Sequence, residues 1–341
     1  MSKSIIQDKL NRQIHDLRIS VIDRCNFRCT YCMPEEEYNK HYTFLQKDKW
    51  LTFDEIVRLT KIFIQLGVDK VRITGGEPLL RPEIETLISK LSEISGIKDL
   101  ALTTNGSHLK DKALALKQAG LQRLTVSLDT LDEDVFKKMS GQKGDVKQVL
   151  EGIKEAERAG FDAIKINVVV QKGVNEHTVI DMVDYFRRTN HILRFIEYMD
   201  VGNCNGWEMK HVVPTKELIE RISQKFVLKS MSPNYYGEVA ARFKFDDGPG
   251  EIGFITSVTQ PFCSSCTRAR LSTDGQIYTC LFAQNGQDIK TALRNDASDE
   301  ELTKIISCIW QNRQDRYSEL RQEIHRKHQE MHKVEMFQIG G

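Results

Sequence analysis

Short apolar runs alternate with longer amphipathic segments through the first two-thirds of the chain. The apolar runs are rich in β-branched residues and are typical of strands. They span residues 17–23, 70–76, 99–105, 123–129, 163–171 and 193–201. The segments between them have helical length, and four of them are followed by Gly67, Gly96, Gly120 and Gly160. Strands that alternate with helices predict a parallel sheet, either in a partial (β/α)₈ barrel or in a doubly wound open sheet.

The pattern changes after about residue 228, where apolar and polar residues alternate in short runs. Residues 235–258 and 268–282 predict hairpins, the second of them turned at Asp274 and Gly275. A helix with regularly spaced apolar residues follows from residue 299. We therefore expect an α/β fold in which residues 1–228 form a partial (β/α)₆ TIM-like barrel. Residues 229–341 are expected to form a C-terminal α+β domain that closes the open side of the barrel.

The composition is that of a globular protein without an obvious polyanionic or lipid partner. The chain has 341 residues, 40% of them hydrophobic, and 49 basic residues balance 48 acidic ones to a net charge of +1. This balance predicts neither nucleic-acid nor membrane binding. The apolar runs are shorter than the roughly 20 residues of a membrane span, and residues 1–13 lack a signal-peptide pattern. We therefore expect a cytoplasmic protein.

Cysteines 25, 29 and 32 form a C-x₃-C-x₂-C motif within eight residues. Thiols stay reduced in the cytosol, so clustered cysteines there indicate a metal site rather than disulfides. A closed zinc site takes four ligands, and three thiolates leave it one short. On a 4Fe-4S cluster, three cysteines leave one iron open to another ligand. Buried structural cysteines and a zinc site completed by a distant histidine are the alternatives.

A second triad, Cys263, Cys266 and Cys280, has the spacing C-x₂-C-x₁₃-C and again lacks a fourth ligand nearby. It predicts a second open 4Fe-4S cluster, with structural zinc as the alternative. Arg268 and Arg270 follow two residues apart, so they project from one face of an extended strand and suit an anion.

Polar groups also gather where the predicted strands end. In a parallel barrel these ends carry the active site. The sequence Gly75-Gly76-Glu77-Pro78 follows the second strand and allows close approach of a ligand to the backbone. Further candidates at strand ends are Thr103, Ser127 and Met199. Cations inside the strands, namely Arg18, Arg72, Lys165 and Arg194, predict a strongly anionic ligand such as a polyphosphate.

The first motif, with Tyr31 before its third cysteine, resembles the radical S-adenosylmethionine superfamily. The wider sequence resembles the GTP 3′,8-cyclase family of molybdenum cofactor biosynthesis nearly from end to end. The stretches that carry this resemblance are "LRISVIDRCNFRCTYCMP", "VRITGGEPLLR", "KINVVVQKGVN", "RFIEYMDVG", "GFITSVTQPFCSSCTRARLS" and the closing double glycine.

This resemblance implies two 4Fe-4S clusters, S-adenosylmethionine as cofactor and GTP as substrate. The first cluster would bind S-adenosylmethionine and release a 5′-deoxyadenosyl radical, and the second would meet the guanine. The residues implied for S-adenosylmethionine are Tyr31, Gly76, Ser127 and Met199. Those implied for GTP are Arg18, Arg72, Thr103, Lys165, Arg268, Ala269 and Arg270, with Arg18, Arg268 and Arg270 implied as catalytic residues. The Gly340–Gly341 tail is implied to reach into the site.

The resemblance further implies an electron donor such as flavodoxin or ferredoxin, a homodimer, and a downstream cyclic pyranopterin monophosphate synthase. Two other function classes stay open from the sequence. One is a radical enzyme that modifies peptides and carries an auxiliary cluster. The other is a non-enzymatic zinc or iron–sulfur scaffold. Cys204 and the three histidines 325, 328 and 332 have no assigned role; the histidines are interpreted as a solvated helix face.

Overall fold

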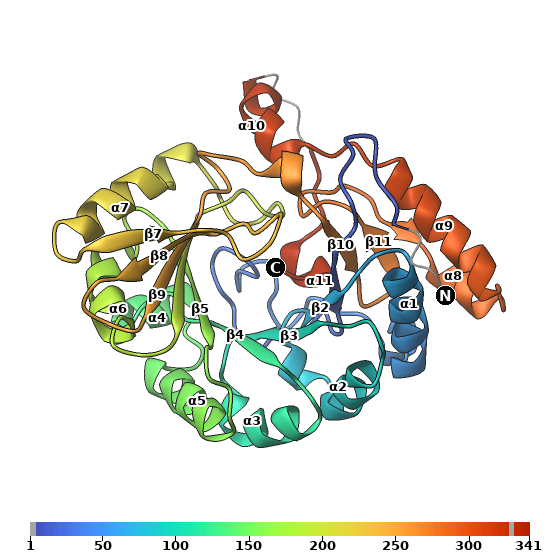
Figure 1. The fold of residues 1–341 in the computed structure, drawn as a ribbon, viewed down its shortest axis with the longest axis horizontal. Coiled ribbons are helices and arrows are strands. Elements are labelled where there is room, and N and C mark those ends of the chain that lie inside the picture. Colours follow the sequence, from blue (N-terminus) through green and yellow to red (C-terminus); the bar gives the residue numbers. More distant parts are fainter. Residues whose placement is uncertain (1–4, 327–330) are drawn as a thin grey trace.

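The computed structural model describes residues 5–326 and 331–341, so His328 lies outside the described residues. Its strands form one twelve-stranded sheet in the order β12-β11-β10-β1-β2-β3-β4-β5-β6-β9-β8-β7. From β10 to β9, neighbouring strands run parallel. The sheet curves around the centre of the molecule without closing on itself (Figure 1). The prediction of an α/β partial barrel is confirmed.

All six predicted parallel strands are present. They are β1 (Asp16–Ser20), β2 (Lys70–Thr74), β3 (Asp99–Thr104), β4 (Arg123–Ser127), β5 (Lys165–Val170) and β6 (Ile192–Glu197). Each strand ends before its predicted last residue, because the last residues of each apolar run belong to the loop that follows the strand. Along β1 the strand alternation buries Leu17 and Ile19 completely against the helices and turns Asp16 and Arg18 toward the centre.

The helices of the β/α units surround the sheet (Figure 1). They are α1 (Phe53–Gln65), α2 (Ile84–Ser92), α3 (Leu109–Gln118), α4 (Glu133–Met139), α5 (Val146–Arg158), α6 (Val179–Phe186) and α7 (Thr215–Ser223). The capping box of Thr52 and Glu55 fixes the start of α1, since each side chain accepts from the other's backbone N–H. The apolar faces of this ring pack on the outer face of the sheet, and the core lies between them.

Residues after 228 extend both edges of the same sheet. At one edge lie β9 (Glu251–Ile255), β8 (Ala241–Phe245) and β7 (Leu228–Met231), with β9 beside β6. At the other lie β10 (Arg268–Leu271), β11 (Gln276–Tyr278) and β12 (Gln287–Asp288), with β10 beside β1. Antiparallel pairing of β8 with β9 and of β10 with β11 confirms the two hairpins. The division into two domains at residue 228 stays a prediction.

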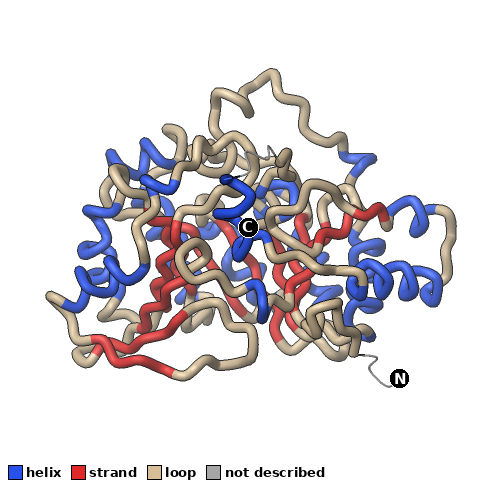
Figure 2. The backbone as a smooth tube through the Cα atoms, turned by 90° about the horizontal axis from the view of Figure 1, so that it is seen from above, coloured by secondary structure: helices blue, strands red, loops and turns tan. Residues whose placement is uncertain are grey.

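The remaining helices are α8 (Lys290–Arg294), α9 (Asp299–Gln311), α10 (Tyr317–Arg326) and α11 (Met336–Ile339). Helix α9 lies beside α1, and α11 lies at the centre of the barrel in both views (Figures 1 and 2). Within the described ranges, no helix is both long enough and apolar enough to cross a bilayer.

The loop at residues 232–240, between β7 and β8, links the two edges of the sheet. Its Tyr235 hydroxyl accepts a hydrogen bond from Lys70 Nζ at 2.6 Å, and its ring stacks on His15 at 6.1 Å. Gly237 has φ +83°, and a Cβ there would lie 2.9 Å from the Ser265 carbonyl oxygen. Only glycine fits this contact, so the loop lies directly against the segment that carries the second cysteine triad.

Candidate active site

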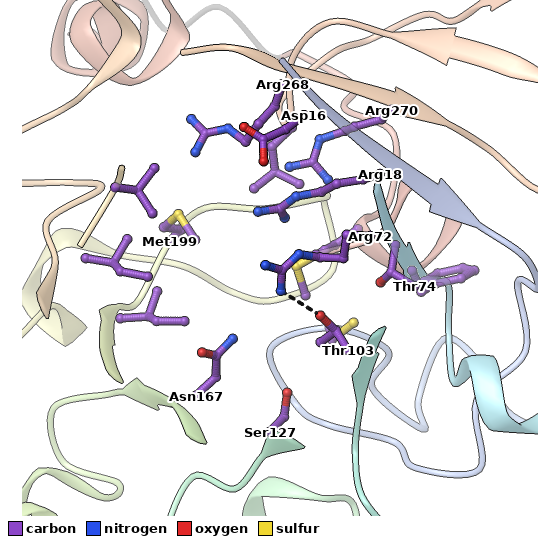
Figure 3. A pocket seen from close by; sticks show the side chains of 18 of the residues that line it. Asp16, Arg18, Arg72, Thr74, Thr103, Ser127, Asn167, Met199, Arg268 and Arg270 are labelled. Atoms are coloured by element: carbon purple, nitrogen blue, oxygen red, sulfur yellow. Dashed lines mark hydrogen bonds between the residues drawn. The ribbon is translucent and has the colours of Figure 1, made fainter. Parts of the chain in front are cut away.

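A cavity of about 320 Å³ lies inside the curve of the sheet (Figure 3). Most of the predicted site residues line it: Arg18, Cys25, Cys29, Tyr31, Cys32, Arg72, Gly76, Thr103, Ser127, Met199, Cys263, Cys266, Arg268, Arg270 and Cys280. Two predicted residues, Lys165 and Ala269, are not in this lining. Ala269 is buried between the two arginines of β10 with its side chain on the opposite face of the strand. Both cysteine triads therefore face one space.

The first triad lies in the loop after β1. Cys25 Sγ accepts hydrogen bonds from Phe27 N at 3.4 Å and from Asn105 Nδ2 at 3.7 Å. Burial, and then the charge of Glu77, raise the pKa of the Cys25 thiol to about 12. Burial also raises the pKa of Cys32. Three thiols on one cavity wall, with N–H donors aimed at sulfur, fit the ligand set of an iron–sulfur cluster that keeps one iron open.

The Gly75-Gly76-Glu77 turn packs tightly on this cysteine loop. A Cβ on Gly76 would lie 2.2 Å from the Arg24 carbonyl oxygen, so the approach requires glycine. The buried Glu77 carboxylate accepts from Thr104 Oγ1 and from Asn105 N, both at 2.7 Å. Burial raises the pKa of Glu77 to about 7 against the effect of these donors. Glu77 thus joins the ends of β2 and β3 beneath the first triad.

Tyr31 is held by a carboxylate that the sequence analysis missed. Its hydroxyl donates to Asp129 Oδ2 at 2.7 Å, and Asp129 Oδ1 accepts from Val169 N at 2.8 Å. Burial raises the pKa of Asp129 to about 6. Asp129 directly follows the "SL" of the fourth predicted strand end, but its partner lies far away in sequence. It fixes Tyr31 in the cavity wall, to which Ser127 also belongs. Ser127 lies across the cavity from Arg268 and Arg270 (Figure 3).

The second triad is surrounded by cations. Cys266 Sγ accepts from Arg268 at 3.2 Å and from Arg313 at 3.0 Å. Burial opposes ionisation of Cys266, but the two guanidinium groups outweigh it and lower the pKa of Cys266 to about 6. Arg12 donates to the Cys263 carbonyl oxygen at 2.8 Å and braces the same loop. A thiolate favoured in this way fits a cluster ligand.

Neither triad converges on a point. Among the described residues, no three Cys, His, Asp or Glu side chains are placed to hold a single metal ion. The ligands of a cubane cluster bind separate irons, so they need not meet at one position.

Three arginines lie side by side across β10, β1 and β2. Arg18 is in register with both Arg270 and Arg72 (Figure 3). Arg72 donates to Thr103 Oγ1 at 3.0 Å. In the part of the chain that the structure describes, Arg18 has no hydrogen-bond partner. Burial, and then the charges of Arg270 and Arg72, lower the pKa of Arg18. The nearby Asp16 carboxylate acts in the opposite direction but does not outweigh them. A buried charge that its neighbours do not balance favours binding of an anion.

Further cations stand on β5 and β6. Arg194 donates to Asn167 Oδ1 at 2.6 Å, but its buried Nε has no partner. Lys165 has no hydrogen bond within the described ranges. Burial, followed by the charges of Arg194 and Arg123, lowers the pKa of Lys165 to about 6. Arg194 lines the cavity, whereas Lys165 stands outside the lining but close enough to feel the charges of Arg194 and Arg72. Two further cations near the arginines fit a polyphosphate.

A cation and a carboxylate that were not predicted from the sequence stand one step further down the strands. Lys70 Nζ lies 3.4 Å from Asp16 Oδ1, and Asp16 Oδ2 accepts from Thr267 Oγ1 at 2.9 Å. Both residues line the cavity. Each stands two positions before a predicted arginine, so strand alternation would have found them. Asn167 also lines the cavity, and the same alternation from Lys165 would have found it. Tyr235 lines the cavity as well, and the sequence gives no signal for it.

The C-terminal residues Gly340 and Gly341 lie within this site, as the family resemblance implies. The Gly340 carbonyl oxygen accepts a hydrogen bond from Arg270, and Gly341 lines the cavity. Gly340 has φ +75°, and a Cβ there would lie 2.1 Å from Thr74 Cγ2. Helix α11 supplies Met336 and Phe337 to the cavity wall.

Comparisons with known proteins identify the family. Residues 19–186 match the model described as Radical SAM superfamily, and residues 191–319 match that described as Molybdenum Cofactor Synthesis C. A GTP 3′,8-cyclase of Xanthomonas axonopodis pv. citri is 51% identical over 98% of this chain and 99% of its own. The chain belongs to the GTP 3′,8-cyclase family. A second member, from Staphylococcus epidermidis, is 49% identical over 99% of this chain and all of its own.

Solved structures support the fold of this family member. The crystal structure of Streptococcus suis SuiB bound to S-adenosylmethionine has a TM-score of 0.60 and 17% sequence identity, covering 87% of this chain and 69% of the other. A second crystal structure of Streptococcus suis SuiB has a TM-score of 0.59 and 16% sequence identity, and the match covers 89% of this chain and 67% of the other. At these identities the likeness concerns the fold alone.

Lys165 predicts that GTP binding is coupled to proton uptake. Its pKa of about 6 leaves the amine neutral above that pH, and a bound triphosphate would raise the pKa again. GTP binding at about pH 8 should therefore take up close to one proton, and affinity should fall by up to about tenfold per pH unit above pH 6. Titration calorimetry in two buffers of different ionisation enthalpy measures this uptake. The arginine of Lys165→Arg is always charged, so this variant should bind GTP without taking up the proton that Lys165 takes up in the wild type. Equal proton uptake in both proteins would exclude protonation of Lys165 on GTP binding.

Proposed function

We propose that this protein converts GTP to (8S)-3′,8-cyclo-7,8-dihydroguanosine 5′-triphosphate, the first step of molybdenum cofactor biosynthesis. One observation carries the proposal: two cysteine triads face a single cavity in which Arg18, Arg72 and Arg270 lie side by side. The first feature suits radical chemistry at a cluster, and the second suits a nucleoside triphosphate. Membership of the GTP 3′,8-cyclase family supports both the radical chemistry and the nucleoside triphosphate substrate.

When bound, the first cluster and S-adenosylmethionine supply a 5′-deoxyadenosyl radical that removes the ribose 3′ hydrogen of GTP. Cys25, Cys29 and Cys32 would hold the cluster. Around them, Gly76 offers close backbone approach, and the Asp129 hydrogen bond fixes the ring of Tyr31. The residues proposed to bind S-adenosylmethionine are Tyr31, Gly76, Ser127 and Met199.

The opposite part of the cavity would bind GTP. Arg18, Arg268 and Arg270 are the proposed catalytic residues, since charge from three guanidinium groups at one end of the cavity fixes the nucleotide by its phosphates. The full set proposed to bind GTP is Arg18, Arg72, Thr103, Lys165, Arg268, Ala269 and Arg270. Ala269 would act through its backbone, because its side chain faces away. Lys70, Asp16 and Asn167 join this set on their positions in the cavity wall.

The second cluster is part of the same proposal. Cys263, Cys266 and Cys280 would bind it with one iron left for the guanine. The hydrogen bonds from Arg268 and Arg313 to Cys266 support a thiolate ligand at this place. We further propose a flavodoxin or ferredoxin as electron donor, a homodimer, transfer of the product to cyclic pyranopterin monophosphate synthase, and a cytoplasmic location.

Anaerobic purification with metal and binding analysis tests the function. We expect about eight irons per chain, in keeping with two cubane clusters, and binding of GTP in clear preference to ATP. Incubation with S-adenosylmethionine, a reductant and GTP should then give 5′-deoxyadenosine and the cyclised nucleotide in equal amounts. A colourless zinc protein would support the scaffold alternative, and radical formation without use of GTP would support the peptide-modifying alternative.

A further inference from the structure

The loop after β6 contains a buried carboxylate that lies outside the cavity lining. Asp200 is 4% exposed. Its oxygens accept from Arg321 Nε at 2.8 Å, from Lys333 Nζ at 2.9 Å and from the Tyr317 hydroxyl, and His325 Nε2 lies 3.3 Å away. Arg321 and Tyr317 belong to α10, whereas Lys333 precedes α11. One side chain thus joins the β6 loop to two separate C-terminal segments.

Asn203, three residues later, binds the backbone of the same terminal segment. Its Nδ2 donates to the Lys333 carbonyl oxygen at 2.6 Å, and its Oδ1 accepts from Lys333 N at 2.9 Å. Asn203 N also donates to Glu335 Oε1 at 2.9 Å. Glu335 in turn forms a capping box with Gln338 that starts α11. The loop therefore defines where α11 begins.

The segment held in this way forms part of the cavity wall. Phe337 and Ile339 are buried, and Phe337 packs on Tyr38 with ring centroids 5.0 Å apart. Beyond them, the Gly340 carbonyl accepts a hydrogen bond from Arg270, one of the proposed catalytic arginines. The contacts of Asp200 and Asn203 consequently extend, through α11, to the orientation of a guanidinium group in the site.

The same contacts border the second triad. Lys333 Nζ lies 4.7 Å from the centre of the Tyr317 ring, and that ring stacks on Phe282 at 4.5 Å. Phe282 lines the cavity, and its backbone N–H donates to Cys280 Sγ at 3.4 Å. The terminal segment, the aromatic pair and the cysteine loop are therefore one packed unit.

We propose that Asp200 and Asn203, with Lys333 and Glu335, form a clasp that keeps the terminal segment in the cavity and so orients Arg270. Asp200 and Asn203 are positioning residues, since neither lines the cavity. Lys333 is the only residue of the terminal segment among the Asp200 contacts named above, so its removal releases the segment while Asp200 keeps Arg321 and Tyr317 as partners. The effect on turnover rests on the proposed function, because it is measured with GTP. The placement of the terminal segment does not, because hydrogen exchange measures it directly.

The decisive variants are Lys333→Met and Asn203→Ala, with Lys333→Arg as the conservative replacement. Lys333→Met leaves the Asp200–Arg321 pair in place. In the holoenzyme, we expect amide hydrogen exchange in residues 334–340 to rise at least about tenfold, with exchange in the barrel strands unchanged. Turnover of GTP should fall at least about tenfold in kcat, with iron content at the wild-type level. Lys333→Arg should recover most of both quantities.

Lys229→Met is the matched control, because Lys229 is an exposed lysine paired with Asp246 on edge strand β7. It should leave exchange and turnover unchanged. Wild-type exchange in residues 334–340 of Lys333→Met and Asn203→Ala would overturn the clasp. Raised exchange with undiminished turnover would overturn the positioning role. If the wild-type protein did not turn over GTP, the proposed function would fail while the exchange measurement still decided the clasp.

Discussion

Replacing Cys263 with alanine should abolish formation of the cyclised nucleotide. The variant loses one of the three thiolates proposed to hold the second cluster, so the whole second cluster should be lost. Iron should fall from about eight to about four per chain. The first triad lies in a different loop, so cleavage of S-adenosylmethionine to 5′-deoxyadenosine should continue without coupling to GTP. Anaerobic iron analysis and chromatography of both products measure these effects.

Cys308→Ala is the control for this experiment. Cys308 is an exposed cysteine on α9, outside both triads, and its replacement should change neither iron content nor product. Product at the wild-type rate from Cys263→Ala would refute the two-cluster mechanism. Full iron content with no product would instead place the role of Cys263 outside cluster binding.

Arg18→Met should weaken GTP binding strongly and, at the same time, stabilise the ligand-free protein. Arg18 lies among Arg72, Arg268 and Arg270 and has no hydrogen-bond acceptor in the described structure. Removing one partner of a buried charge pair costs about 2–5 kcal/mol, which is about 30- to 4,000-fold in affinity. In the absence of ligand the same charge is repelled by its neighbours, so its removal should raise the melting temperature.

Calorimetric titration with GTP and thermal unfolding without it measure the two opposite effects. Arg58→Met is the matched control, because Arg58 is an arginine on α1 that pairs with Asp299 far from the cavity. It should leave GTP affinity unchanged. A lower melting temperature for Arg18→Met would mean that Arg18 is a structural residue, and unchanged affinity would remove it from the proposed substrate site.

The fold was largely predictable because each β/α unit is determined locally. Leu17 and Ile19 alternate with polar residues along β1, and helix α1 carries its own capping box. The pairing of the late strands was not predictable. Strand β9 joins β6 and β10 joins β1, and these contacts depend on how the whole sheet curves. The sequence indicates the hairpins but not which edge of the parallel sheet each hairpin extends.

The site divides in the same way. Its cysteines and arginines stand in short motifs, so their spacing identifies them. Asp129 was missed because it follows β4, whereas Tyr31, whose hydroxyl it binds, lies in the loop after β1. Lys70 and Asp16 could have been found by extending the alternation of Arg72 and Arg18 by one step. Tyr235 and Asp200 could not, since both act through loops whose paths depend on tertiary packing.

The pairing of β1 with β10 also bears on how the protein is assembled. Asp16 faces Arg268 across this pair, although most of the chain separates them in sequence. Pairing between such distant segments forms late, because the intervening polypeptide must first be brought together. A nascent chain leaving the ribosome therefore exposes its first three thiols long before this edge of the sheet is complete. During that interval the three thiols lie at a site whose wall still lacks the residues of β10.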